Sequence, residues 1–144
     1  MMDDDLTAEV QRVAAAVVEA HQAGADGRLD YSEESLAAVE ALLHEASDFV
    51  DGMSEKQVDD VARQFGCYIL EVARRKWGGR YQWYPDRDAP VLVVGEPGFR
   101  VAMLTWDKTK GRLLGDEADN IPFFYAGFAE RVRGAANGVN VLYV

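Results

Sequence analysis

Residues 66–79, GCYILEVARRKWGG, bring together groups that could do chemistry, namely a cysteine and a glutamate set among arginines. On a helical wheel Cys67 lies near Arg63 and Arg74, and nearby cations lower the pKa of a thiol. A cysteine nucleophile also needs a base, usually histidine, but both histidines of the chain fall on predicted N-terminal helices. We therefore interpret Cys67 as a small, semi-buried residue and predict no catalytic residue.

The same wheel places Glu71 on one side of the helix with Arg63, eight residues earlier, and Arg74, three residues later. Two interpretations stay open for this group. It is an ion pair that fixes the helix against a sheet, or it is a polar patch that lines a groove.

Aromatic and basic residues alternate just beyond this helix. The aromatic residues are Trp77, Tyr81, Trp83 and Tyr84, and the basic ones are Arg74, Arg75, Lys76, Arg80 and Arg87. Aromatic rings beside cations suit single-stranded nucleic acid or a nucleotide base. The same rings also suit a protein core, and the overall acidity of the chain favours the core.

Asp116, Glu117 and Asp119 form an acidic cluster that could hold a divalent cation through oxygen ligands. The cluster matches no calcium loop, and it suits the capped start of a helix better than a metal site. The histidines and the cysteine lack metal-ligand spacing, and no phosphate loop, GxSxG or HExxH motif is present. We expect no metal and no cofactor.

Three helices are predicted to form the N-terminal half. Apolar residues at helical spacing predict the first over Leu6–Ala23. The second begins at an N-cap, Ser32. The third begins at Ser54, which forms a capping box with Gln57, and ends at the glycine pair 78–79.

Gly66 stands in the middle of the third helix, where glycine is unfavourable by roughly 1 kcal/mol relative to alanine. On the wheel it lies beside Ala62 and Ala73. Three small residues together let a neighbouring helix or sheet approach closely, so we predict that Gly66 is a close-packing glycine.

The period of the apolar pattern then changes to that of strands, which are predicted over Arg80–Tyr84, Val91–Gly95 and Phe99–Trp106. The last is apolar on both faces, so it is covered on both sides or uses one side for association. Asp107–Gly111 is predicted as a polar turn and Arg112–Leu114 as a continuation of the meander.

A fourth helix is predicted from about Asn120 to Arg133, with Pro122 in its first turn, and a closing strand over Val139–Val144. The predicted fold class is therefore α+β, in one domain spanning 1–144. N-terminal helices and one C-terminal helix pack on a small antiparallel β-sheet. The parts are 1–79 mainly helical, 80–118 antiparallel strands, 119–136 helix and 139–144 closing strand.

The net charge of −10 is divided unevenly between the two halves of the chain. Residues 1–60 carry 16 acids and 3 bases, a net of −13, and residues 61–144 carry 9 acids and 12 bases, a net of +3. An acidic half repels phosphate backbones, so we expect no nucleic acid, and it favours a basic protein partner. The alternative is a solvated face that only keeps the protein soluble.

No apolar run approaches the roughly 20 residues of a membrane helix, so we expect no membrane association. The start MMDDDL is acidic, unlike the basic start of a signal peptide. The chain has a single cysteine, which fits a reducing compartment. We therefore expect a cytoplasmic protein.

The segments LDYSEESLAAVEALL, GCYILEVARRKWGGRYQW and TKGRLLGDEADNIPFFYAGFAERV together resemble a family of small, uncharacterised bacterial proteins, common in actinobacteria. The resemblance covers most of residues 29–133. It implies a bacterial cytoplasmic protein and carries no activity. Glu71, Trp83, Asn120 and Tyr125 stand at the motif positions, whereas Cys67 does not.

The function that we expect is that of a small, acidic, non-catalytic interaction or accessory protein. The alternative is a small-ligand binder or an enzyme with a pocket between the third helix and the sheet. Its candidate ligand-binding residues are Glu71, Arg74, Trp83, Lys108, Asn120 and Tyr125. We also expect a homodimer, formed through the strand Phe99–Trp106 or through the uncharged closing strand.

Overall fold

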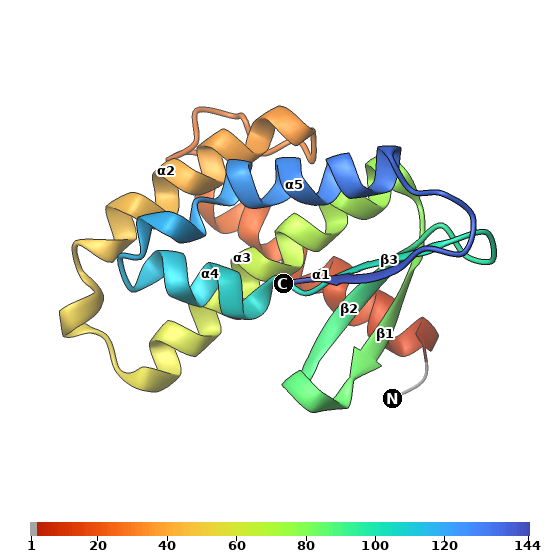
Figure 1. Ribbon diagram of the computed structural model, residues 1–144. Helices are drawn as coiled ribbons and strands as arrows, with labels where there is room; N and C mark the ends of the chain where they lie inside the picture. Colours follow the sequence, from red (N-terminus) through yellow and green to blue (C-terminus); the bar gives the residue numbers. More distant parts are fainter. Residues whose placement is uncertain (1–2) are drawn as a thin grey trace.

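The computed structural model describes residues 3–144 and shows an α+β protein, as predicted (Figure 1). Met1 and Met2, the start of the predicted helical part, lie outside the described residues. The helices are α1 Asp3–His21, α2 Leu36–Ser47, α3 Glu55–Trp77, α4 Trp106–Leu113 and α5 Ile121–Arg133. The strands are β1 Arg80–Tyr84, β2 Ala89–Val94, β3 Arg100–Met103 and β4 Asn140–Tyr143.

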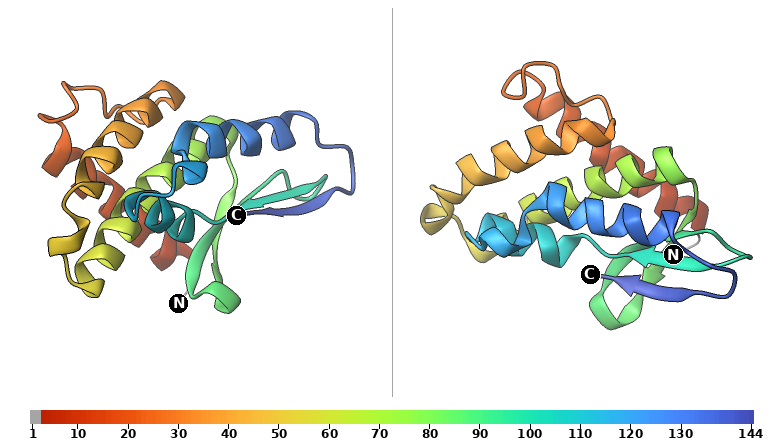
Figure 2. Two further views of the ribbon diagram at one scale, coloured as in Figure 1. Left: turned by 60° about the vertical axis from the view of Figure 1, so that its left-hand side comes forward. Right: turned by 45° about the horizontal axis from the view of Figure 1, so that its top comes forward.

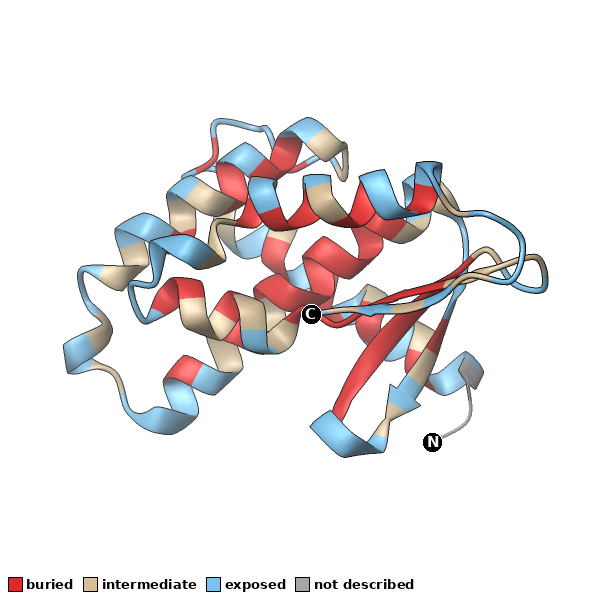
Figure 3. Ribbon diagram, viewed as in Figure 1, coloured by how far each residue is buried: buried red, intermediate tan, exposed pale blue. Residues whose placement is uncertain are grey.

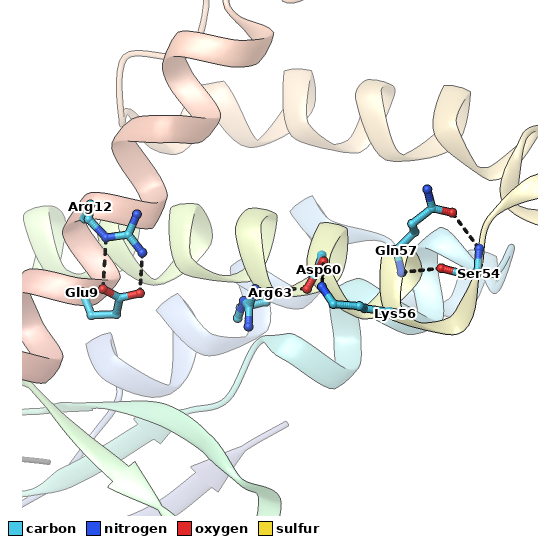
Figure 4. Close-up of polar contacts among 7 residues, drawn as sticks. All are labelled: Glu9, Arg12, Ser54, Lys56, Gln57, Asp60 and Arg63. Atoms are coloured by element: carbon cyan, nitrogen blue, oxygen red, sulfur yellow. Dashed lines mark hydrogen bonds and ion pairs between the residues drawn. The ribbon is translucent and has the colours of Figure 1, made fainter.

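Side-chain caps begin the predicted second and third helices. The Ser32 side chain accepts from the backbone N–H of Ser35, which starts a 3-10 turn that leads into α2. Ser54 and Gln57 form the predicted capping box at the start of α3, drawn in Figure 4. These caps satisfy N–H groups that have no partner within the helix.

The centre of the molecule is α3, whose residues 65–73 are all buried, on every side of the helix (Figure 3). It packs against α1 and α4 and reaches β2. Gly66 lies where α4 begins, because a Cβ on Gly66 would be 2.6 Å from Cδ1 of Trp106 and 3.1 Å from Oγ1 of Thr105. The predicted close-packing role of Gly66 is confirmed, and the neighbour that approaches is the start of α4.

The sheet has the order β1-β2-β3-β4. The prediction of an antiparallel sheet is wrong, because the sheet is mixed. β1 and β2 pair antiparallel, as do β2 and β3, but β3 and β4 are parallel. The reason is the connection: α4 and α5 lie between β3 and β4, and such a helical crossover returns the chain in the same direction. Figure 2 shows α5 passing alongside β3 and β4.

The prediction for residues 99–114, a strand followed by a turn and a further strand, is wrong in part. The strand ends at Met103, and Trp106–Leu113 is the helix α4. The buried side of α4 includes Thr109 and Arg112, two polar residues, so the apolar pattern that marks a helix is hidden. Gly111 lies within this helix, and a Cβ there would clash with the carboxylate of Asp119, so the glycine lets this side chain approach α4.

Both faces of the two central strands are buried, as the apolar pattern of the third predicted strand indicates. Val101 and Met103 belong to the main core, and Ala102 belongs to a second, smaller apolar cluster. That cluster contains Ala89, Val91, Val93, Ala102 and Leu104. Residues 3–144 contain no helix that is both long enough and apolar enough to span a membrane.

Candidate functional site

Glu71 is a fully buried carboxylate at the junction of α3 and β1. The Arg74 guanidinium donates to both of its oxygens, at 2.7 and 3.1 Å, and the Tyr81 hydroxyl donates at 2.5 Å. Arg75 adds an ion pair at 3.5 Å. Burial raises the pKa of Glu71, but the hydrogen bonds from Arg74 and Tyr81 outweigh it, so the net shift is downward. The group therefore stays ionised and connects the helix to the sheet.

Arg63 does not join this group, although the helical wheel placed it on the same side. Its guanidinium pairs instead with Asp60 at 3.0 Å, and Lys56 pairs with the same carboxylate at 2.8 Å (Figure 4). Of the two interpretations for Glu71 and Arg74, the contacts favour the ion pair that holds α3 against β1.

Two of the other candidate residues support the entry into α5. Asn120 accepts from the backbone N–H of Phe123 at 3.0 Å and so caps the helix. Lys108 pairs with Asp119 at 2.9 Å, and its ammonium lies 5.3 Å from the ring centre of Phe124. These contacts also explain the acidic cluster before α5, since Asp116 caps a 3-10 turn there.

Tyr125 and Trp83 lie in two further places. The Tyr125 hydroxyl accepts from the indole N–H of Trp77 at 3.1 Å, and burial and the nearby Glu33 raise the pKa of Tyr125. Trp83 is part-exposed, and its ring lies edge-on to that of Trp106. The six candidate residues thus fall into separate groups rather than around one cavity.

A hollow of about 640 Å³ lies where the end of α3 meets the sheet, but none of the six candidates lines it. Its lining residues are Trp77, Gly79, Arg80, Val93, Gly95, Glu96 and Pro97. Two cations near it, Arg80 and Arg100, are already paired, because both contact Glu96. This hollow lies between α3 and the sheet, where a pocket was predicted, but the residues predicted to line that pocket lie elsewhere.

Cys67 is buried, and burial raises the pKa of its thiol to about 12. A thiol with this pKa is almost wholly protonated at neutral pH, whereas a nucleophile must be a thiolate. Among residues 3–144 no group of three or more histidine, cysteine, aspartate or glutamate side chains has the arrangement of a metal site.

Arg112 is a buried cation that the sequence pattern does not predict as a site residue. Its Nε donates to Glu40 at 2.6 Å and its Nη2 to the Nδ1 of His44 at 3.0 Å. Because a guanidinium can only donate, this Nδ1 must accept, and the proton of a neutral His44 sits on Nε2. The three side chains border a hollow of about 530 Å³ together with Asn120 and Glu117. Glu40 and His44 are four residues apart on α2 and so share one side of the helix. This spacing is the feature of the sequence that could have indicated the site.

β4 is an edge strand whose outer backbone is unpaired in the sheet. The carbonyl of Val139 accepts from the backbone N–H of Arg100 in β3, at 2.7 Å, and that of Tyr143 from the N–H of Leu104, just after β3, at 3.0 Å. Backbone groups of alternate residues point to opposite sides of a strand, so those of Asn140 and Leu142 point away from β3. We call these outward groups, with the side chains of Leu142 and Val144, the β4 edge. Its side chains are uncharged, and Leu142 and Val144 are 41% and 49% exposed.

A groove runs beside the β4 edge, between β4 and α5. It consists of two adjoining hollows of about 490 and 160 Å³, which share Glu130 and Arg131. The remaining lining residues are Phe123, Gly127, Gly134, Ala135, Val139, Val141 and Tyr143. A Cβ on Gly127 would clash with the Tyr143 hydroxyl, so the missing side chain lets this ring lie across α5.

The other edge of the sheet, β1, is protected where β4 is not. β1 carries the exposed cation Arg80, contacts α1 and runs directly into Pro85. Charged side chains and proline are the usual means by which proteins prevent a strand edge from pairing. No charged residue and no proline occurs between Asn140 and Val144. The contrast makes the β4 edge the strongest candidate for an interaction surface.

No family model, curated protein or solved structure matches this chain. The resemblance to a bacterial family therefore stays a prediction.

Proposed function

We propose that this chain is a non-catalytic interaction protein of the bacterial cytoplasm and that it binds an extended polypeptide segment along the β4 edge. The observation that carries the proposal is the unprotected edge itself. A segment that adds as a further strand would satisfy the outward backbone groups of Asn140 and Leu142. The groove beside α5 would accept alternate side chains of that segment.

The charge distribution supports a protein partner rather than a nucleic acid. The edge belongs to the half of the chain with a net charge of +3, and the acidic half is mainly helical. The acidic helices would repel phosphate backbones and steer basic surfaces towards the protein.

Selection from a library of displayed random peptides tests the proposal. Wild type is compared with Leu142→Pro, which removes an N–H that points away from β3 and so leaves the bonds between β3 and β4 intact. Leu142→Thr is the matched control, because it changes the side chain and keeps the N–H. We expect wild type and Leu142→Thr to enrich uncharged, β-branched peptides and Leu142→Pro to lose them. Equal enrichment by all three proteins would refute strand addition at this edge.

A further inference from the structure

We infer that the segment which binds the β4 edge is β4 of a second copy of this chain. The inference rests on the proposed function, since it names the partner of the same surface. Two four-stranded sheets then join about a two-fold axis into one continuous sheet with the strands β3-β4-β4-β3 at its centre. The two β4 strands run antiparallel, as a two-fold axis perpendicular to the sheet requires.

The backbone of β4 is self-complementary in this arrangement. An axis through Leu142 pairs this residue with its own copy, and the outward N–H of each donates to the outward carbonyl of the other. Asn140 then lies opposite Val144 of the second copy, and Val141 lies opposite Tyr143. No pair places like charges opposite each other, because the segment 140–144 is uncharged.

The side chains of the β4 edge fit the same axis. Leu142 lies in register with Ala102, on the sheet face that carries the second apolar cluster. Across the axis Leu142 would contact its own copy, so the apolar surface that it exposes in one chain would be covered in two. Tyr143 points to the opposite face, where its ring lies 5.2 Å from that of Phe124 on α5.

The positions of the two α5 helices also favour a second copy. α5 lies over β3 and contacts Tyr143 of β4. Neighbouring strands are about 4.8 Å apart, so a helix over the β3–β4 pair would lie roughly 10 Å from its copy, close to the spacing of packed helices. The outward side of α5 carries Phe123, 75% exposed, and the small residue Gly127. It also carries one acid and one base, Glu130 and Arg131, which can pair across the axis.

The charge of the rest of the chain favours contact through the β4 edge over contact through the helical half. Residues 1–60 carry a net charge of −13, so the helical halves of two copies repel each other. The β4 edge lies in the other half, and the two charged residues that line its groove, Glu130 and Arg131, cancel each other. Two copies therefore meet with the least repulsion through this edge.

Sedimentation equilibrium with two opposite charges at one position tests the inference. Wild type should sediment as a species of twice the 15.9 kDa chain mass at micromolar concentration. Leu142→Asp and Leu142→Lys each place like charges opposite each other, so each alone should have the mass of one chain. An equal mixture of the two should return to twice that mass, because the opposed charges then attract. This recovery can occur only if both variants are folded.

Two results would show that the partner is not a second copy. One is a wild type that has the mass of one chain at every concentration, and the other is a mixture of the two variants that stays at that mass. The peptide selection distinguishes this failure from that of the proposed function. A monomeric wild type that still enriches peptides in a Leu142-dependent manner would retain strand addition with another partner. A monomer that enriches none would remove both proposals.

Discussion

Gly66 shows how a missing side chain at one position can decide how two helices pack. The carbonyl of Gly66 accepts from the Thr105 hydroxyl at 2.7 Å, and the Trp106 ring occupies the space where a Cβ would lie. The cost of glycine in a helix is offset here by contacts that no larger residue permits. Single residues of this kind hold α3 in place, and α3 in turn supports the sheet.

Gly66→Leu should lower the free energy of unfolding by about 1–3 kcal/mol, because the added atoms must displace Trp106 and Thr105. Urea denaturation measures the change. Gly52→Ala is the matched control, since a Cβ on Gly52 meets no atom within 4 Å. An unchanged midpoint for Gly66→Leu would show that this packing is not tight.

Glu71→Gln should lower the free energy of unfolding at pH 7 by about 2–4 kcal/mol, since it leaves Arg74 beside a buried neutral group. The folded-state pKa of Glu71 lies below its ordinary value of 4.5. Its contribution is therefore complete above pH 4.5 and is lost as the pH falls through the lower folded value. The difference in the free energy of unfolding between wild type and Glu71→Gln, measured by urea denaturation, should therefore become smaller in acid. A difference that is constant from pH 7 to pH 3 would contradict the role of the ionised carboxylate.

Cys67 should react slowly with alkylating reagents at neutral pH, because its pKa is raised to about 12 by burial. The alkylation rate of the native protein is compared with that of the urea-unfolded chain across pH 6 to 10. We expect the unfolded chain to react much faster throughout. A native thiol that reacts as fast as the unfolded one at pH 7 would reverse this view.

At the scale of elements, β4 combines two roles on its two sides. Val141 points its backbone groups to β3, and Leu142 points its groups away. Val141→Pro should therefore lower the free energy of unfolding by about 1–3 kcal/mol, because it removes a hydrogen bond between β3 and β4, whereas Leu142→Pro should lower it far less. Urea denaturation of the two variants measures this difference. Equal losses would show that the register of β4 differs from the one described.

The sequence predicts the elements whose apolar pattern and caps agree, and it fails where they conflict. Ser54 and Gln57 predict the start of α3, and the uncharged run 139–144 predicts β4. α4 has only 8 residues, and its buried side holds Thr109 and Arg112, so its sequence pattern predicts a turn rather than a helix. The parallel pairing of β4 follows from the crossover through α4 and α5. Because the sequence pattern does not predict α4 as a helix, it does not predict this pairing either.

The candidate site shows the same limit for single residues. Glu71 and Arg74 were predicted together because residues three apart share one side of a helix. Glu40, His44 and Arg112 come from two helices, and no local spacing connects α2 to α4. The β4 edge was foreseen as an edge-forming sequence, but its groove depends on how α5 packs, which only the structure shows.

At the scale of the whole molecule, the fold separates an acidic helical part from a sheet edge with little net charge. α1 and α2 lie in the residues that carry the net −13, and β4 lies in those that carry +3. Association through β4 would leave two acidic surfaces exposed on one assembly, each free to attract a basic partner. Such association requires that the outward backbone groups of β4 become paired.

Amide hydrogen exchange of Leu142, followed by NMR at several protein concentrations, measures this pairing directly. In a single chain the Leu142 N–H points to solvent, and the Val141 N–H is bonded to β3 and serves as the internal reference. We predict that the Leu142 amide is protected at high concentration and loses this protection on dilution, while Val141 stays protected throughout. A Leu142 amide that exchanges at the rate of an unpaired group at every concentration would contradict the account.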